Sequence, residues 1–304
     1  MLIPCYNEEH TIGKVIQGFK EALPEAVIYV YDNNSTDHTA AFAADESAIV
    51  RYECRQGKGN VIRRMFREID ADCYILVDGD MTYSPQDAAG MVRLIHEKRA
   101  DMVVGDRISS AYAAISKRRF HSMGNRMVTG AVNLLFGTDY KDVMTGYRCL
   151  SYAFVKSFPA ISNGFEVETE MSIHAADHDL AVENMEIAYR DRPDGSCSKL
   201  HTISDGIRIL SMIGKMFRLY RPFSFFMGIA LAMAAVSTFF IIPVLVEYHG
   251  THLVERFPTL IVCGLTYLAA LLSMYTGIIL QTMRSRERRE FEISLKALRR
   301  TNDL

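Results

Sequence analysis

Two long apolar stretches near the C-terminal end restrict what this chain can fold into. Residues Phe223–Val246 and Phe257–Met283 contain no Asp, Glu, Lys or Arg. Each is longer than the ~20 residues that a helix needs to cross the hydrocarbon core of a bilayer. A helix that is apolar on every side must be buried in protein or in lipid. We therefore expect a transmembrane hairpin of two helices over residues 223–283, with the short connector Glu247–Arg256 between them.

Positively charged residues flank this hairpin at both ends. Three precede the first stretch and four follow the second: Lys215, Arg218, Arg221, Arg284, Arg286, Arg288 and Arg289. Because the cytoplasmic flanks of membrane helices are enriched in Lys and Arg, we expect both flanks in the cytoplasm. The sequence thus predicts an integral membrane protein whose N-terminal domain and both termini are cytoplasmic, with no signal peptide. Its six cysteines form no CxxC pair, which fits reduced thiols in that compartment.

The segments next to the hairpin have amphipathic patterns. In residues 204–222, cationic and apolar side chains recur at helical spacing, which predicts a helix lying in the headgroup region of the membrane. Residues 284–304 form a basic cytoplasmic tail. Its apolar residues Phe291, Leu295 and Leu298 suggest one more amphipathic helix, packed on the N-terminal domain or on a neighbouring subunit.

Residues 1–203, by contrast, alternate between short β-rich runs and helical stripes. Strands are expected at Leu2–Ile3, Val27–Tyr31, Ile49–Tyr52, Cys73–Val77 and Met102–Val104. Helical stripes fall between them, and Ser35 is a candidate cap for the helix after the second strand. This order predicts an α/β domain with a doubly wound, mostly parallel sheet and right-handed crossovers.

The apolar run Tyr74–Val77 predicts a buried central strand, and it ends abruptly in Asp78-Gly79-Asp80. Ligands of open α/β sheets bind just beyond the carboxyl ends of the strands. Two carboxylates one residue apart repel each other unless a cation lies between them. Oxygen ligands favour Mg²⁺ or Mn²⁺, and such a metal usually also binds substrate phosphates. Asp78 and Asp80 are therefore candidate metal ligands, and a solvated Asp-Gly turn is the alternative.

Polar residues also follow the other early strands, at the same edge of the predicted sheet. Asp32 ends the second strand, and its carboxylate is suited to ribose hydroxyls or a base edge. Arg55 and Lys58 lie among flexible glycines and are suited to a diphosphate. Alternatively, Asn7 and Ser35 cap helices and Lys58 is a solvated charge. Their convergence on one edge, beside the two aspartates, favours a nucleotide diphosphate site.

The total charge is nearly balanced, with 34 Lys+Arg against 36 Asp+Glu, so we expect no nucleic acid partner. Residues 106–126 are nevertheless locally basic, which suits a phosphate that Arg can bind bidentately. A basic, solvated loop near a membrane is the alternative. Farther along, Asp142 and Arg148 are candidates to pair with each other. Glu168 and Glu170 would diverge on a helix, so only one of them is expected to face the site.

These motifs together resemble the sequence blocks of inverting family 2 glycosyltransferases with the GT-A fold. The blocks in the first part of the chain are IPCYNEE, YDNNSTD, RQGKGN and VDGD. The later blocks are similar to the polyprenyl-phosphate branch, which includes dolichyl-phosphate mannose synthases: VVGDR, KRRFHSMGN, DVMTGYR, GFEVETEM and RPDGSCSKL. Two positions depart from the family pattern, because Thr82 stands where mannose synthases often have Gln, and Asn33 stands where many relatives have Asp.

The resemblance extends the set of candidate site residues. With the residues above, the donor site comprises Pro4, Tyr6, Asn7, Glu8, Asp32, Lys58, Asp78, Gly79, Asp80, Arg192, Ser198 and Lys199, the last three on a loop that would close over the diphosphate. The resemblance further implies that Arg107, Arg118 and Ser122 hold a lipid phosphate. Glu170 matches the family's position better than Glu168, and joins Asp80 among the candidate catalytic residues.

The resemblance and the apolar hairpin together predict a metal-dependent, inverting hexosyltransferase. It would move glucose or mannose from a donor of the UDP-glucose or GDP-mannose class to a polyprenyl phosphate, giving a β-linked lipid phosphate sugar. A phosphate dianion is already nucleophilic at neutral pH, so little general-base help is needed. The alternatives are a family 2 transferase acting on a sugar hydroxyl of a lipid-linked glycan, and a non-catalytic nucleotide-sugar-binding membrane scaffold. The tail is compatible with a homo-oligomer.

Overall fold

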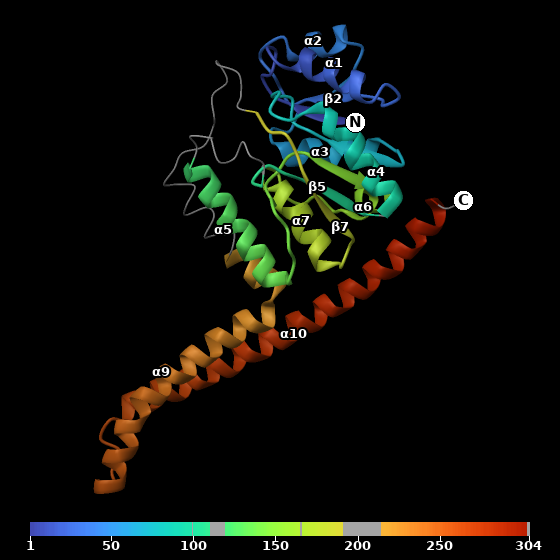
Figure 1. Cartoon of the computed structure of the whole chain (residues 1–304). Helices are drawn as coiled ribbons and strands as arrows, with labels where there is room; N and C mark the ends of the chain where they lie inside the picture. Colours follow the sequence, from blue (N-terminus) through green and yellow to red (C-terminus); the bar gives the residue numbers. More distant parts are fainter. Residues whose placement is uncertain (99, 110–118, 165, 191–213, 303–304) are drawn as a thin grey trace. The chain divides into compact units, whose positions relative to one another are not determined.

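A computed structural model describes residues 1–98, 100–109, 119–164, 166–190 and 214–302 of the chain (Figure 1). The chain divides into two compact units. The first contains Met1–Gly206 and Phe291–Leu304, and the second contains Ile207–Glu290. The last helix, α10 (Phe257–Asn302), contributes to both units.

The first unit is built on a seven-stranded sheet with the strand order β3-β2-β1-β4-β6-β5-β7. Its strands are β1 (Leu2–Cys5), β2 (Tyr29–Asp32), β3 (Ile49–Tyr52), β4 (Cys73–Leu76), β5 (Met102–Asp106), β6 (Arg148–Ser151) and β7 (Val182–Glu186). Only β6 runs antiparallel to its neighbours β4 and β5 among these strands. The predicted doubly wound, mostly parallel sheet is confirmed, and β4 lies in its middle.

Helices cover both faces of this sheet (Figure 1). The first four are α1 (Ile12–Ala22), α2 (Thr39–Asp45), α3 (Lys58–Glu68) and α4 (Ala88–Lys98), the last preceded by the 3₁₀ turn η1 (Pro85–Asp87). The later ones are α5 (Arg119–Phe136), α6 (Tyr152–Ser157) and α7 (Val167–Asp177). The stripe of buried residues in α1 follows from the apolar spacing of its sequence: Ile12, Val15, Ile16 and Phe19.

The two faces of the sheet carry separate apolar cores, because successive side chains of a strand point to opposite sides. Leu2 packs in the core that contains residues of α3, α6 and α7. Its neighbour Ile3 packs in the other core, with residues of α1, α2 and α4. Strands β1, β2 and β4 are therefore covered on both sides, whereas most residues of the edge strand β3 are exposed. The ends of the covered strands are thus their accessible parts.

One expected helix cap is wrong. Helix α2 begins at Thr39, and its preceding residue, His38, makes no side-chain cap. Ser35 lies too far upstream, and its Oγ instead accepts a hydrogen bond from the backbone N–H of Asn7 at 2.9 Å. The segment between β2 and α2 instead makes hydrogen bonds to the loop after β1.

The second unit contains the helix α9 (Pro222–Thr251) and most of α10. Both helices are long and apolar enough to cross a membrane, by length and composition. They contact each other through small and hydroxyl side chains, as helices in membranes do. Ser237 Oγ donates to the carbonyl of Cys263 at 2.9 Å, and Ser273 Oγ donates to the carbonyl of Phe226 at 3.0 Å. The expected interfacial helix lies mostly outside the described residues, of which 214–220 are helical.

The last part of α10 belongs to the first unit, which is one of the two packing sites that the sequence predicts for the apolar residues of the tail. Leu295 is buried in the core that contains α3, α6 and α7, and Phe291 packs against it. The Phe291 ring lies 3.8 Å from the ring centroid of His178 and 5.3 Å from that of His174. The apolar residues of the tail therefore complete the core of the N-terminal unit.

Candidate active site

The candidate site lies where the winding of the sheet changes direction. From β1 the chain builds β2 and β3 on one side, and it then crosses to place β4 on the other side of β1. Loops diverge from such a switch point at the carboxyl ends of the strands, and they leave a crevice between them. The loops after β1 and β4 carry six of the twelve donor-site residues that the sequence predicts, and Asp32 is the last residue of β2.

The loops after β1 and β2 are tied to each other. Asn7 adopts a left-handed backbone with φ of 54°, and its Oδ1 accepts from the backbone N–H of Thr36 at 2.8 Å. The backbone N–H of Glu8 donates to Thr39 Oγ1 at 2.8 Å. Pro4 lies within β1, opposite Tyr31 of β2, and half-buried Tyr6 follows the strand. Asn7 thus links the loops after β1 and β2 by hydrogen bonds and caps no helix.

Asp32 ends β2 with a buried carboxylate that is only half satisfied. Its Oδ2 accepts from the backbone N–H of Ser35 at 3.2 Å. Its Oδ1 is buried and has no hydrogen-bond partner among the described residues. Because an unpaired buried carboxylate oxygen is costly, this atom is a natural acceptor for a ligand hydroxyl or N–H.

Asn33 is a residue whose role the sequence analysis missed. It is buried, and its Nδ2 donates to the carbonyls of Glu53 and Arg55, both at 2.8 Å. Its Oδ1 accepts from the backbone N–H of Gly57 at 2.7 Å. The side chain therefore holds the turn between β3 and α3 in place. An Asp here has no donors for the two carbonyls, which explains why this chain has Asn at this position.

The turn after β4 holds its two aspartates in different surroundings. The carbonyl of Gly79 accepts from Thr11 Oγ1 at 2.7 Å, which fixes the turn against the start of α1. Asp80 is buried, and its Oδ1 accepts from the backbone N–H and the hydroxyl of Thr82 at 3.1 and 2.6 Å. Asp78 is the more open of the two, and it meets a lysine.

Lys58, at the first residue of α3, forms ion pairs with both Asp78 Oδ1 and Glu168 Oε1. Burial by itself would lower the pKa of the ammonium, but the charges of Asp78 and Glu168 outweigh it and raise the pKa of Lys58. Burial raises the pKa of Glu168, and the Lys58 charge opposes that shift. The second oxygen, Glu168 Oε2, is buried and has no partner in the described part of the chain.

Gly146 makes room for this arrangement. A Cβ added at Gly146 would overlap the carboxylate of Asp78, so only glycine allows the backbone so close. On the other side, Gly57 has φ of 126° and abuts the carbonyl of Asn163. At both glycines, the absence of a side chain allows neighbouring groups to pack closely beside Lys58 and Asp78.

Glu168, rather than Glu170, faces the candidate site, which corrects the expectation from the family position. Two residues apart on α7, the two side chains diverge as expected. The Glu170 carboxylate accepts from the backbone N–H groups of Ile161 and Ser162, at 2.8 and 2.9 Å. Glu170 therefore supports the loop that lies against Gly57.

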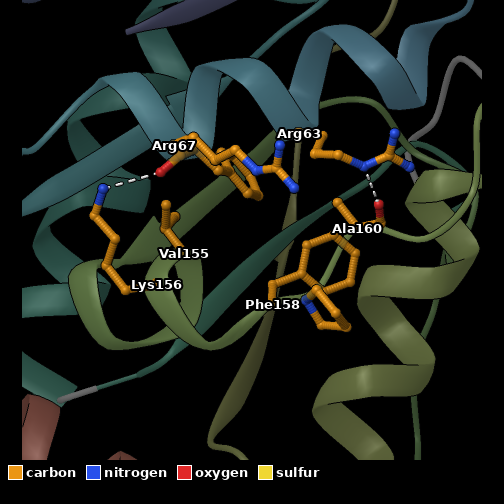
Figure 2. A pocket seen from close by; sticks show the side chains of 8 residues that line it. Arg63, Arg67, Val155, Lys156, Phe158 and Ala160 are labelled. Carbon is orange, nitrogen blue, oxygen red and sulfur yellow. Dashed lines mark hydrogen bonds between the residues drawn. The ribbon is translucent and has the colours of Figure 1, made fainter.

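A polar hollow of about 310 Å³ lies between α3 and the segment after α6 (Figure 2). A cationic side chain that lines it holds the same loop that Glu170 contacts. Arg63 Nε donates to the carbonyl of Ala160 at 2.6 Å, and its Nη2 donates to the carbonyl of Ile161 at 2.9 Å. Lys156 Nζ donates to the carbonyl of Phe66 at 2.9 Å. Arg63 and Lys156 thus hold backbone carbonyls in place, so we assign this hollow a structural role.

Arg107 follows β5 and pairs with Asp142, which lies far from it in the sequence. Its Nε and Nη2 donate to the two carboxylate oxygens of Asp142 at 2.7 and 3.1 Å. Burial disfavours the Asp142 charge, but the Arg107 guanidinium outweighs this and lowers the pKa of Asp142. The expected pair of Asp142 with Arg148 is therefore wrong. Buried Arg148, the first residue of β6, donates instead to the carbonyls of Val143 and Thr145, while Asp142 pairs with Arg107.

Arg107 is connected to the surroundings of Asp78 through Tyr83 and Gly146. Arg107 Nη1 donates to the hydroxyl oxygen of Tyr83 at 3.4 Å, and the backbone N–H of Gly146 donates to the same oxygen at 3.0 Å. Since Gly146 abuts Asp78, the arginine lies near the crevice. Arg118, Arg192, Ser198 and Lys199 lie outside the described residues, as does the side chain of Ser122.

The residues present fit a divalent metal that is held partly by substrate. The described part of the chain contains no cluster of three or more His, Cys, Asp or Glu side chains suited to a metal. Mg²⁺ is commonly bound by one or two carboxylates together with substrate phosphates. Asp78 and Asp80 would supply the carboxylates, and a diphosphate would supply the remaining oxygen ligands.

Comparison with known proteins places this geometry in context. Glycosyltransferase AglJ of Haloferax volcanii is 31% identical over 238 residues, which are 78% of each chain. Protein RfbJ of Shigella flexneri is 52% identical over 107 residues, 35% of this chain and 83% of RfbJ. A dolichol-phosphate mannosyltransferase of Pyrococcus furiosus is 25% identical over 183 residues, 57% of this chain and 51% of that protein.

Solved structures show the same fold. The glucosyl-3-phosphoglycerate synthase of Mycobacterium tuberculosis, in complex with Mn²⁺, UDP-glucose and glycerol 3-phosphate, superposes with a TM-score of 0.54. It is 22% identical, and the match covers 71% of this chain and 77% of that chain. The family model described as glycosyl transferase family 2 matches residues 1–153, which contain the loops after β1, β2 and β4. With its sheet, its switch-point aspartates and this match, the chain belongs to glycosyl transferase family 2.

Proposed function

We propose that this protein transfers a hexose from a nucleotide diphosphate sugar to a polyprenyl phosphate, with inversion, at the cytoplasmic face of a membrane. The observation that carries the proposal is the connected arrangement of Asp78, Gly146, Tyr83 and Arg107. It sets a guanidinium suited to an acceptor phosphate close to carboxylates suited to a donor's metal–diphosphate group. Such an arrangement matches a reaction in which both partners are phosphorylated.

The donor would lie in the crevice at the switch point. The unpaired Asp32 Oδ1 would accept from its ribose or base, and Asp78 and Asp80 would hold Mg²⁺ or Mn²⁺ on its diphosphate. A bound metal offsets the charge that grows on the departing nucleoside diphosphate. The structurally similar synthase was crystallised with Mn²⁺ and UDP-glucose, which supports a donor of this class.

The acceptor side relies on position more than on proton transfer. A phosphate monoester is mostly a dianion at neutral pH and can attack the anomeric carbon directly. Arg107 is held in one orientation by Asp142. A phosphate that binds it therefore does not have to order the arginine side chain, which reduces the entropy cost of guiding the phosphate oxygen. Attack opposite the leaving group on an α-linked donor would give a β-linked product.

The two long apolar helices support a lipid acceptor. By length and composition both can cross a membrane, which would keep the site near lipid headgroups. The relative from Pyrococcus furiosus, a dolichol-phosphate mannosyltransferase, is named for a lipid phosphate acceptor. We propose that the catalytic unit and both termini lie in the cytoplasm, from the positive charges at both ends of the hairpin.

A second acceptor class is favoured by Glu168. This buried carboxylate has a raised pKa and an oxygen without a partner among the described residues, which are properties of a general base. A transferase that acts on a sugar hydroxyl of a lipid-linked glycan needs such a base. A hydroxyl acceptor therefore remains the competing candidate.

The two candidates are separated by offering purified full-length protein labelled UDP-glucose or GDP-mannose, Mn²⁺ and one lipid at a time. We expect label to become extractable into organic solvent with polyprenyl phosphate and not with the matched alcohol, polyprenol. Transfer to a polyprenyl diphosphate-linked saccharide alone would support the hydroxyl acceptor. Transfer to none of these lipids from any nucleotide sugar would refute the proposal.

A further inference from the structure

The ion pairs of Lys58 form a row of three side chains that runs from the interior toward the surface. The Glu168 side chain is 5% exposed, that of Lys58 is 9% exposed, and that of Asp78 is 27% exposed. Glu168 therefore lies at the buried end and Asp78 at the open end, with the ammonium between them. A ligand that enters the crevice meets Asp78 first.

This row places two cations in competition for one carboxylate. Lys58 already pairs with Asp78 Oδ1, the residue that the proposed function assigns to a divalent metal. Two positive groups on one carboxylate repel each other strongly in a partly buried site. A metal that binds Asp78 must therefore displace the ammonium or bind weakly.

The buried end of the row has room for the displaced charge. Glu168 already accepts from Lys58 through Oε1, and its Oε2 is the buried oxygen without a partner among the described residues. An ammonium has three donors, so a small shift toward Glu168 would satisfy both carboxylate oxygens. Glu168 is thus placed to pair with the Lys58 ammonium when that ammonium leaves Asp78.

We propose that the Lys58 ammonium stays paired with the Asp78 carboxylate until a divalent cation binds together with its nucleotide. Glu168 is then a positioning residue, because it pairs with the ammonium that the cation displaces from Asp78. The inference rests on the proposed metal–diphosphate site and adds a role for two residues beside it. At rest, the Lys58 ammonium offsets the charge of the metal-binding carboxylate of Asp78. Tight metal binding then requires the diphosphate, which supplies the additional negative charge.

Titration of the full-length protein in detergent with Mn²⁺ alone tests this, with free Mn²⁺ measured by electron paramagnetic resonance. Glu168→Gln removes half of the counter-charge of Lys58 and leaves it bound to Asp78, so the Mn²⁺ affinity should fall about tenfold, or about 1.4 kcal/mol. Lys58→Met combined with Glu168→Gln frees Asp78, so the affinity should rise about tenfold above wild type. Lys58→Arg keeps the positive charge and should bind Mn²⁺ as weakly as wild type.

Opposite signs for the two Gln-containing variants are the diagnostic result, since a purely structural role would weaken binding in both. Changes in the same direction, or no binding by the double variant, would overturn the inference. If the double variant does not fold, as checked by its thermal unfolding in EDTA, an unchanged affinity in Glu168→Gln alone would overturn it. Because no sugar or lipid is present, failure of transfer to polyprenyl phosphate would refute the proposed function and leave this result standing.

Discussion

Replacing Asn33 by Asp tests how the turn that carries Lys58 is held. The substitution removes the two donors to the carbonyls of Glu53 and Arg55, which are worth about 1 kcal/mol each. It also leaves a buried carboxylate facing these carbonyl oxygens, at a further cost of roughly 1–3 kcal/mol. We expect a total destabilisation of about 3–5 kcal/mol, which lowers the Tm of a domain of this size by roughly 10–15 °C.

The assay is thermal unfolding of the full-length protein in detergent, followed with a thiol-reactive dye that reports exposure of buried Cys5 and Cys149. The matched control is Asn34→Asp, one residue away. Asn34 is exposed and its Nδ2 donates to the carbonyl of Cys54 at 2.8 Å, so we expect a loss of less than about 1 kcal/mol. Equal unfolding temperatures for the two variants would refute the role given to Asn33.

Three further substitutions test the site and the core. Asp80→Ala should reduce sugar transfer at least about 100-fold in protein that is still folded at the assay temperature, and normal turnover would exclude a metal role for this residue. Gly146→Ala forces Asp78 to move and should lower turnover about 100-fold, whereas Gly130→Ala, whose Cβ meets nothing within 4 Å, should not. Burial and, secondarily, His178 lower the pKa of His174 to about 3, so neutral His174 stabilises the fold above pH 6.5 and this contribution is lost as the pH falls toward 3. Between pH 7 and pH 5, wild type should lose roughly 2 kcal/mol more stability than His174→Leu in thermal unfolding, and identical pH profiles would contradict the assignment.

Apolar runs made the parallel half of the fold predictable. Strand β3 has the bounds that the sequence predicts, and the run Tyr74–Val77 gives the middle strand because a strand covered on both faces must be apolar throughout. Strand β6 was not predicted, since it begins with Arg148. The charge of Arg148 is tolerated there because backbone carbonyls accept its donors, and that compensation exists only in the folded chain.

The candidate site was predictable where its residues follow strand ends. Asp32 and Asp78 could be placed at one edge because parallel strands end together. The pairing of Lys58 with Glu168 could not be predicted, because these two residues are far apart in the sequence. Helical spacing shows that Glu168 and Glu170 diverge, but only the packing of α7 decides which of them faces Lys58.

The position of Leu295 has a practical consequence for anyone who wishes to work without detergent. The core of the catalytic unit draws on residues that follow the apolar hairpin, so it is discontinuous in the sequence. A fragment that stops at Gly206 lacks Phe291 and Leu295, and it exposes the apolar surface that they cover. A fragment in which a short linker replaces the hairpin and restores the end of α10 would keep that surface covered, and we expect it to be the more soluble of the two.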